Sequence, residues 1–258
     1  MYALDMGYVS FKLAFGNYDV WEARHGKEVS IAAQDSKPAR KEIFPDYKAQ
    51  RVYGQTEVIQ IVSDLRKYIA EESTLPLCKI EGSEADDILA CWKLFNNDGI
   101  VTQDKDYFQL PGLDYTLTHE FKIYEKQTVL DKCSNFTYPL AKQNFALYQM
   151  LMGCTADNVP RVLGYGKEGR EQVADLLKAM EHGSLESALV SMFEDKILLN
   201  AKLILFPYFI YMNRYEDWFS LWCEGKYYDS NNWTDYYKLI THNLKPNTTQ
   251  AQMSLWDF

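Results

Sequence analysis

Residues 83–106 read SEADDILACWKLFNNDGIVTQDKD, and this stretch decides the class of fold. Ser83 is a candidate helix N-cap, Asp86 follows three residues later, and apolar residues then recur at helical spacing, at Ile88, Leu89, Trp92 and Phe95. The apolar run that comes next, at 100–104, ends in an aspartate and is typical of a short strand. The stretch therefore predicts a helix over 83–96 followed by a strand, which is the repeating unit of an α/β fold.

Two earlier segments have the same form as that strand. The runs at 4–5 and 29–35 are apolar and each ends in an aspartate, while 56–72 has apolar residues at helical spacing. After about residue 140 the pattern becomes helical, over 140–152, 168–180, 185–193 and 194–205. Because strands alternate with helices before that point, we expect an α/β fold with a mainly parallel central sheet flanked by helices, and then a helical part.

Bulk composition excludes some classes of protein. The chain has 258 residues, enough for one medium-sized domain or two small ones, and 47% of them are apolar. Its first residues lack the pattern of a secretory signal, and its most apolar window, 197–212, is too short to span a bilayer. Five cysteines are scattered without a Cys-x-x-Cys pair. We therefore expect a cytoplasmic protein with no membrane partner and no zinc site.

The net charge of −9 argues against phosphate binding if only the sum is considered. Its distribution matters more, because acids crowd into short motifs beside a basic run formed by Lys37, Arg40, Lys41, Lys48 and Arg51. That arrangement suits a carboxylate site next to a phosphate-binding strip. The aromatic residues of 208–240 are interleaved with acids that would repel phosphates, so we interpret them as core rather than as a base-stacking platform.

Acidic residues gather where the predicted strands end. In a parallel sheet the carboxyl ends of the strands share one edge, which brings together Asp5, Asp35, Asp104 and Asp106. The start of the helix at 83–96 adds Glu84, Asp86 and Asp87. Taken singly, each has an ordinary explanation as turn chemistry or as a complement to a helix dipole. Together they would repel one another unless a cation neutralised them.

Carboxylate ligands select hard ions such as Mg²⁺, for which Mn²⁺ can substitute. Two such ions roughly 3.5–4 Å apart can activate water and stabilise a leaving oxygen at phosphorus. This chemistry predicts phosphodiester hydrolysis, and it leaves other Mg²⁺-dependent phosphoryl transfer open. No Gly-rich phosphate loop followed by Lys-Ser or Lys-Thr is present, which argues against a P-loop nucleotide hydrolase.

Four motifs resemble those of the flap endonucleases and phage 5′ nucleases, a family that includes the 5′-nuclease domain of bacterial DNA polymerase I. They are FPDYKAQR at 44–51, EADDI at 84–88, TQDKDYFQL at 102–110, and LMGCTADNVP at 151–160 followed by GYG at 164–166. The motifs occur in family order, and the resemblance covers roughly residues 1–205. It implies a PIN-like 5′ nuclease fold with a helical arch and a helix-turn-helix-type motif that binds duplex DNA.

The resemblance also implies a division of the chain. Residues 1–139 would form the metal-binding α/β nuclease core with the arch around 36–72, and 140–242 would form the helical DNA-binding part. Residues 243–258 would be a polar linker and a terminal peptide. The sequence QMSLWDF at 252–258 resembles the peptide that docks on bacterial and phage sliding clamps, with anchors at Gln252, Leu255, Trp256 and Phe258. The alternative is that this tail packs on its own domain.

Site roles carry over from the family by position. A first metal site, with Asp87 close by, would be formed by Asp5, Asp35, Glu84 and Asp86. A second ion would be held by Asp104, Asp106 and Asp157. The catalytic set would be completed by two cations that contact the scissile phosphate, Lys48 and Arg51.

Contacts with DNA outside the catalytic centre carry over in the same way. Phe11 occupies the place of an aromatic that stacks on the flipped terminal base, although a core position on the first helix is an equal alternative. At 159–166, Gly164 and Gly166 would let the backbone approach phosphates or a monovalent cation such as K⁺, and Lys167 follows them.

Two departures from the family pattern concern the second half of the chain. Cys154 stands where the family has aspartate, and a thiol is a soft ligand that suits Mg²⁺ poorly. The second ion would then bind weakly or depend on Asp157 and water. Pro160-Arg161 replaces the usual Pro-Gly. Together with the short segment between Asp5 and Asp35, this indicates a trimmed variant of viral type, working in a bacterial or phage-infected cell.

The leading hypothesis is a structure-specific 5′ nuclease that cuts DNA at a 5′ flap or nick or removes RNA primers, with ribonuclease H activity as one form of that reaction. The alternative is a catalytically weakened nuclease fold that binds branched DNA for a replication partner. A PIN-like ribonuclease is a third hypothesis, and the helical part after residue 150 argues against it.

Overall fold

The structure is a computed structural model that describes residues 2–7, 29–50, 56–72, 75–96, 98–102, 104–111, 115–117, 123–125 and 145–245. Within these residues one sheet has the strand order β3-β2-β1-β4-β5-β6. The strands are β1 (Tyr2–Asp5), β2 (Val29–Ala33), β3 (Leu77–Cys78), β4 (Gly99–Val101), β5 (Tyr115–Leu117) and β6 (Ile123–Glu125). All neighbours pair in parallel except β5 with β6, which confirms the mainly parallel sheet.

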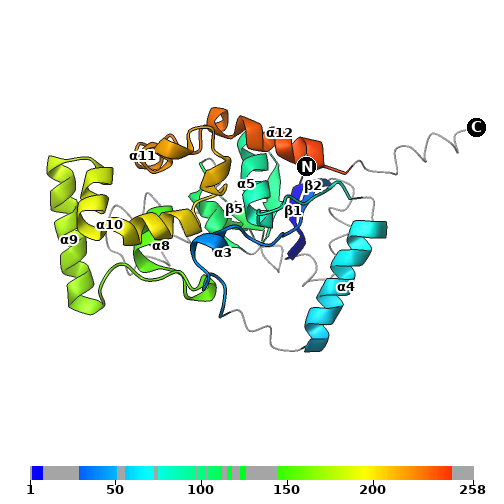
Figure 1. Cartoon of the computed structure of the whole chain (residues 1–258), viewed down its shortest axis with the longest axis horizontal. Coiled ribbons are helices and arrows are strands. Elements are labelled where there is room, and N and C mark those ends of the chain that lie inside the picture. Colours follow the sequence, from blue (N-terminus) through cyan, green and yellow to red (C-terminus); the bar gives the residue numbers. More distant parts are fainter. Residues whose placement is uncertain are drawn as a thin grey trace, which may run out of the picture.

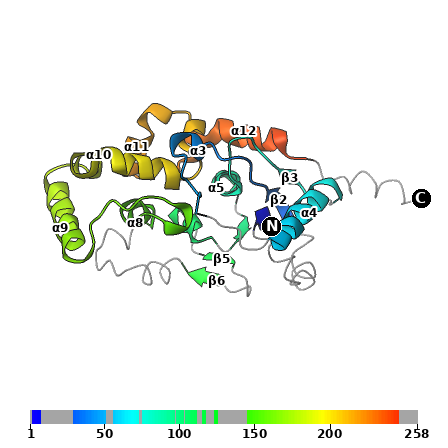
Figure 2. The ribbon, with the colours of Figure 1, turned by 60° about the horizontal axis from the view of Figure 1, so that its bottom comes forward.

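Helices surround this sheet and make up most of the described chain after residue 145. The α-helices are α3 (Arg40–Ile43), α4 (Thr56–Glu72), α5 (Ala85–Phe95), α8 (Phe145–Met152), α9 (Gly166–His182), α10 (Leu185–Ile204), α11 (Trp218–Cys223) and α12 (Thr234–Asn243). Short 3₁₀ turns are η1 (Lys105–Gln109), η2 (Thr155–Asp157), η3 (Phe209–Tyr211), η4 (Tyr215–Asp217) and η5 (Ser230–Trp233). Figures 1 and 2 show α4 at one end of the molecule and α9 at the other, with the sheet and α5 between them.

The core runs without a break from the sheet into the helical part. Helix α5 packs on β1, β2 and β4 through an apolar face that includes Ile88 and Leu89, and α12 covers α5 (Figure 1). The hydroxyl of Tyr236 on α12 donates to Ser83 Oγ at 2.8 Å, and the N–H of Lys245 donates to the Leu77 carbonyl at 3.0 Å. The chain therefore returns to the α/β part at its C-terminal end, and the two parts share one apolar core.

The aromatic residues of 208–240 are mainly core. The side chains of Tyr208, Trp218, Phe219, Trp222, Tyr227, Trp233 and Tyr236 are all buried. They pack on one another, as in the stacked pair of Tyr211 and Tyr236, whose ring centroids are 4.4 Å apart. The interpretation of this segment as packing rather than as a base-stacking surface is confirmed.

Local patterns predicted the helices well and their ends less well. Helix α4 spans 56–72 as expected, and α10 runs through 185–204 with a kink at Glu194 (φ 41°, ψ −127°), where the sequence separated two helices. The predicted N-cap Ser83 is wrong, because Glu84 caps α5 in a capping box with Asp87. Helix α8 begins at Phe145, and 140–144 lie outside the described residues.

None of the helices in the described part of the chain combines the length and the apolar composition that a bilayer crossing requires.

Candidate active site

The carboxyl ends of β1 and β2 bring two aspartates to one place. Asp5 ends β1, and Asp35 follows β2 by two residues. An oxygen of each, together with a guanidinium nitrogen of Arg66 from α4, lies within 4 Å of the point where a β-carbon on Gly7 would stand. The start of α5 is tied to the same place, because the N–H of Ala85 donates to Asp35 Oδ1 at 2.8 Å. The predicted convergence of Asp5 and Asp35 is therefore present, and Arg66 is a neighbour that the sequence did not indicate.

Asp104 joins this group from the end of β4. Thr102 donates its hydroxyl to Asp5 Oδ2 at 3.2 Å and accepts the N–H of Asp104 at 3.1 Å, so a single threonine links the ends of β1 and β4. Asp104 also accepts the N–H of Asp106 at 2.8 Å, which begins the 3₁₀ turn η1. Local hydrogen bonds thus fix the direction in which the TQDKD segment leaves the sheet.

Asp86 connects the helix with the strand ends. Tyr107 donates its hydroxyl to Asp86 Oδ1 at 2.9 Å. Burial, and then the negative charges of Asp104 and Asp5, raise the pKa of the Asp86 carboxyl well above its usual range. The Asp86 carboxyl is therefore buried within the negative field of the sheet edge. A positive ion placed among these carboxylates would relieve their repulsion.

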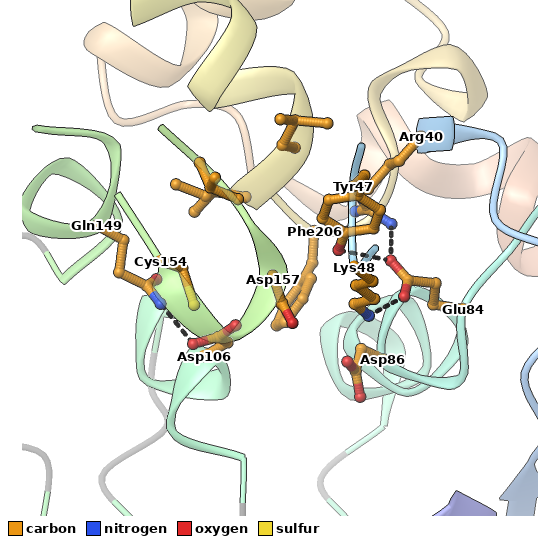
Figure 3. Close-up of a pocket in the computed structure, with 13 residues that line it drawn as sticks. Arg40, Tyr47, Lys48, Glu84, Asp86, Asp106, Gln149, Cys154, Asp157 and Phe206 are labelled. Carbon is orange, nitrogen blue, oxygen red and sulfur yellow. Dashed lines mark hydrogen bonds and ion pairs between the residues drawn. The ribbon is translucent and has the colours of Figure 1, made fainter. Parts of the chain in front are cut away.

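A second acidic group lies beside the first, where η1 meets the segment after α8. Burial and the charge of Asp104 raise the pKa of Asp106 well above its usual range, although Gln149 opposes this by donating its amide to Asp106. Gln149 is only 7% exposed, and its Oε1 has no hydrogen-bond partner among the described residues. Cys154 and Asp157 line the same pocket (Figure 3). An unpaired buried carbonyl beside two carboxylates is a place where a bound cation or its water would find a ligand.

The metal-binding role of these groups remains a prediction. Within the described residues no three Asp, Glu, His or Cys side chains are already arranged to hold one ion. The chemistry of the set is nevertheless right for hard divalent ions, since Asp5, Asp35, Asp86, Asp104, Asp106 and Asp157 supply oxygen ligands only. Cys154 is the exception, and burial raises the pKa of its thiol.

Lys48 is positioned by contact between two of the motifs. Its backbone has a positive φ of 57°, and its N–H donates to the Asp157 carbonyl at 2.8 Å. Asn158 holds the same segment by donating its side-chain amide to the Asp46 carbonyl at 2.9 Å. The 44–51 motif is therefore docked on the 151–160 motif, and the Lys48 ammonium reaches Glu84 in the pocket (Figure 3). Burial works to lower the pKa of Lys48, but the surrounding negative charges, that of Glu84 first among them, together raise the pKa well above its usual value.

Two of the residues predicted at the metal site, Glu84 and Asp87, have protein partners in this structure. Both oxygens of Asp87 accept from Arg40 at 2.7 Å, and Glu84 Oε2 accepts from Arg40 at 2.9 Å and from the Tyr47 hydroxyl at 3.0 Å. Asp87 is fully buried in this ion pair, and its place beside a metal ion stays a prediction. The expectation that Arg40 belongs to a phosphate-binding strip is wrong, because the side chain is 2% exposed and bound to these acids.

The turn between η2 and α9 adopts a backbone conformation that its glycines allow. Gly166 has a φ of 58°, and the N–H of Gly164 donates to Gln172 Oε1 at 2.7 Å. Lys167 points to solvent, with its side chain 83% exposed. Arg161 folds back onto the turn and donates to its carbonyl groups.

Several predicted contacts lie outside the described residues. These are Phe11, Arg51 and the terminal anchors Gln252, Leu255, Trp256 and Phe258.

Comparison with known proteins finds similarity to one family. Residues 17–134 match the family described as "5'-3' exonuclease, N-terminal resolvase-like domain". A 5'-3' exonuclease of Aquifex aeolicus is 28% identical over 161 residues, which cover 60% of this chain and 52% of the relative. A 5'-3' exonuclease of Bacillus subtilis is 32% identical over 143 residues, 52% of this chain and 46% of the relative. The chain is therefore similar to the 5′-3′ exonucleases.

The chain spans about half the length of these two curated relatives. Its fold is also that of the flap endonuclease of bacteriophage T5, whose structure was solved as a pseudo-enzyme-product complex with DNA and metal ions. The two superpose with a TM-score of 0.59 over 93% of this chain and 97% of the phage protein, at 17% identity. At that identity the likeness establishes the fold, and the PIN-like 5′ nuclease architecture expected from the motifs is confirmed.

Proposed function

We propose that this chain is a metal-dependent, structure-specific 5′ nuclease that hydrolyses phosphodiester bonds in DNA with a 5′ flap, a nick or an RNA primer. The observation that carries the proposal is one pocket in which the Lys48 ammonium stands beside Asp86, Asp106 and Asp157. A fixed cation next to clustered carboxylates is what in-line displacement at phosphorus needs, because the carboxylates hold metal ions and the cation stabilises developing negative charge.

The residues have separate roles in this proposal. Asp5, Asp35 and Asp86 would hold one divalent ion, and Asp104, Asp106 and Asp157 a second. When bound, Mg²⁺ or Mn²⁺ would lower the pKa of a water molecule and neutralise the phosphate. Lys48 would leave Glu84 for the scissile phosphate, and Tyr47 and Arg40 would keep Glu84 in place. Arg51 would assist Lys48.

Substrate binding is assigned to the helical part. The phage relative was solved with DNA, and the turn at 159–166 with Lys167 at the start of α9 would contact the duplex of this chain's substrate. The division at about residue 140 does not separate the two roles completely, because carboxylates from both sides of it line the same pocket. Phe11 would stack on the terminal base. The monovalent cation expected at 159–166 is left out of the proposal, because Arg161 already donates to two carbonyls of that turn.

Two further parts of the proposal rest on the sequence. The terminal peptide 252–258 would bind a sliding clamp, and removal of RNA primers would give the enzyme ribonuclease H activity. The cytoplasm as its compartment is supported by the free state of the described cysteines, Cys78, Cys91, Cys154 and Cys223.

Cys154 favours one alternative, a nuclease fold with weakened turnover that binds branched DNA. Its thiol lines the pocket with Asp106 and Asp157 and takes the place of a hard oxygen ligand. Cleavage assays with Mg²⁺ and then with Mn²⁺ separate the two functions. An enzyme cuts the flap in at least one of them, and a binding protein retains affinity and cuts in neither.

The test compares cleavage of a fluorescently labelled 5′-flap duplex by the unaltered protein and by Asp104→Ala. We expect Asp104→Ala to abolish cleavage with its circular dichroism spectrum unchanged. Asp235→Ala is the matched control, because Asp235 is an exposed acid on α12 that pairs only with Lys238 among the contacts described. Cleavage by Asp104→Ala at the rate of the control would rule out the assigned site.

A further inference from the structure

The turn between η2 and α9 contains a positively charged side chain that binds the turn's own backbone. Arg161 donates from Nε to the Leu163 carbonyl at 2.8 Å and from Nη2 to the Gly164 carbonyl at 3.0 Å. Its guanidinium lies over the ring of Tyr165, 4.3 Å from the ring centroid. One cation therefore satisfies two successive carbonyls and is covered by an aromatic face, an arrangement that stabilises a positive charge.

The backbone carbonyl groups of this turn are held rigidly. A β-carbon on Gly169, in the first turn of α9, would stand 2.3 Å from the Gly164 oxygen, so the backbone of the turn packs directly on the helix. The N–H of Gly164 is fixed by Gln172 at 2.7 Å. On the other side, Asn200 donates its side-chain amide to the Pro160 carbonyl at 2.6 Å. The turn thus presents oriented carbonyl dipoles that cannot easily rotate away from one another.

Oriented backbone carbonyls at close range are ligands for monovalent cations. The family resemblance implied such an ion at 159–166, where Gly164 and Gly166 leave room for it, and this chain has Arg161 where the family has glycine. A second cation would have to displace two charge-assisted hydrogen bonds or stand beside a like charge, and both are unfavourable.

We propose that the Arg161 guanidinium serves as a built-in cation for this turn, replacing a bound monovalent ion and making duplex binding independent of K⁺. This inference rests on the proposed function in one respect, that the turn contacts duplex DNA. The positive charge is then permanent, because an arginine side chain does not lose its proton in proteins.

The experiment compares three chloride salts, of K⁺, Na⁺ and Li⁺, at one ionic strength, so that general screening of the phosphates is constant. Thermal unfolding is measured without DNA, and duplex affinity is measured by fluorescence anisotropy with EDTA present to prevent cleavage. The variants are Arg161→Ala and its matched control Arg170→Ala, which removes the same charge from an exposed position on α9.

We expect the unaltered protein and Arg170→Ala each to have the same unfolding midpoint and the same affinity in all three salts. Arg161→Ala should unfold at a lower temperature in Li⁺, because two hydrogen bonds from a charged donor are lost. It should bind the duplex roughly 5- to 30-fold more weakly, which corresponds to about 1–2 kcal/mol. K⁺ should specifically restore part of both losses, because the emptied carbonyls can then bind the ion.

A higher midpoint or affinity of the unaltered protein in K⁺ than in Li⁺ would overturn the inference, and this measurement needs no variant to fold. So would an Arg161→Ala variant that matches Arg170→Ala in every salt, or that is weakened in every salt without recovery in K⁺. If neither the unaltered protein nor either variant binds the duplex in any salt, the proposed function fails. The unfolding midpoints measured without DNA still decide the role of Arg161.

Discussion

Arg40 is the residue whose loss should destabilise the site most, and its contacts allow the effect to be estimated. It donates to Glu84, to both oxygens of Asp87 and to the Leu205 carbonyl, and it joins α3, α5 and the end of α10. Asp87 has no exposed surface, so Arg40→Ala leaves a buried carboxylate without its counter-charge. Breaking such a pair from one side costs about 3–5 kcal/mol. In a protein of this size that corresponds to a fall of roughly 10 °C in the unfolding midpoint.

The assay is urea unfolding followed by tryptophan fluorescence, with Arg214→Ala as the control. Arg214 pairs with Asp217 at the same distance of 2.7 Å, but the two side chains are 58% and 55% exposed, so its loss should cost at most about 1 kcal/mol. Adding Asp87→Asn to Arg40→Ala should recover part of the loss, because no buried charge then lacks a partner. A cost for Arg40→Ala no larger than that of Arg214→Ala would refute the reasoning.

Three other predictions concern the pocket and the buried thiols. Lys48→Ala should slow single-turnover cleavage of a 5′-flap duplex roughly 10²–10³-fold while affinity measured by anisotropy changes little, and an equal loss of both would contradict a role in the transition state. Cys154→Asp should raise Mg²⁺-dependent cleavage and lower the Mg²⁺ concentration needed, whereas an unchanged Mg²⁺ titration would show that position 154 does not influence the ion. Burial raises the pKa of the Cys78 thiol to about 12. Its contribution to stability is therefore complete below the pKa of an unfolded cysteine, near 8.5, and is lost as the pH rises through about 12. Thermal unfolding between pH 8 and 12 should show this fall, and Cys78→Ala should make it shallower without removing it, because burial also raises the pKa of Cys223.

Features set by neighbouring residues could be predicted from the sequence. Helix α4 follows its apolar spacing over 56–72, and Asp5, Asp35 and Asp104 were recognised because each follows an apolar run. The aromatic segment near the C-terminus was assigned to the core from its interleaved acids. These predictions succeed because hydrophobic periodicity acts over a few residues of chain.

Partner choice across the chain could not be predicted in this way. Arg40 looked like one member of a basic run, yet it is buried against acids 44 and 47 residues away. Gln149 has no recognisable motif, and only the packing of α8 on η1 brings it to Asp106. The sequence position of a charged or polar residue does not identify its partner, so these pairings depend on how the elements pack.

The sequence by itself determined the type of fold, the acidic strand ends and the order of the family motifs, because local spacing and short-range chemistry encode them. Only the tertiary structure decided that Asp87 is held by Arg40, that Lys48 docks on Asp157, and that Arg161 binds the carbonyls of its own turn. The physical reason is that a buried charge takes whichever counter-charge or dipole the packed fold places within hydrogen-bond range, and that geometry does not exist before the chain is folded.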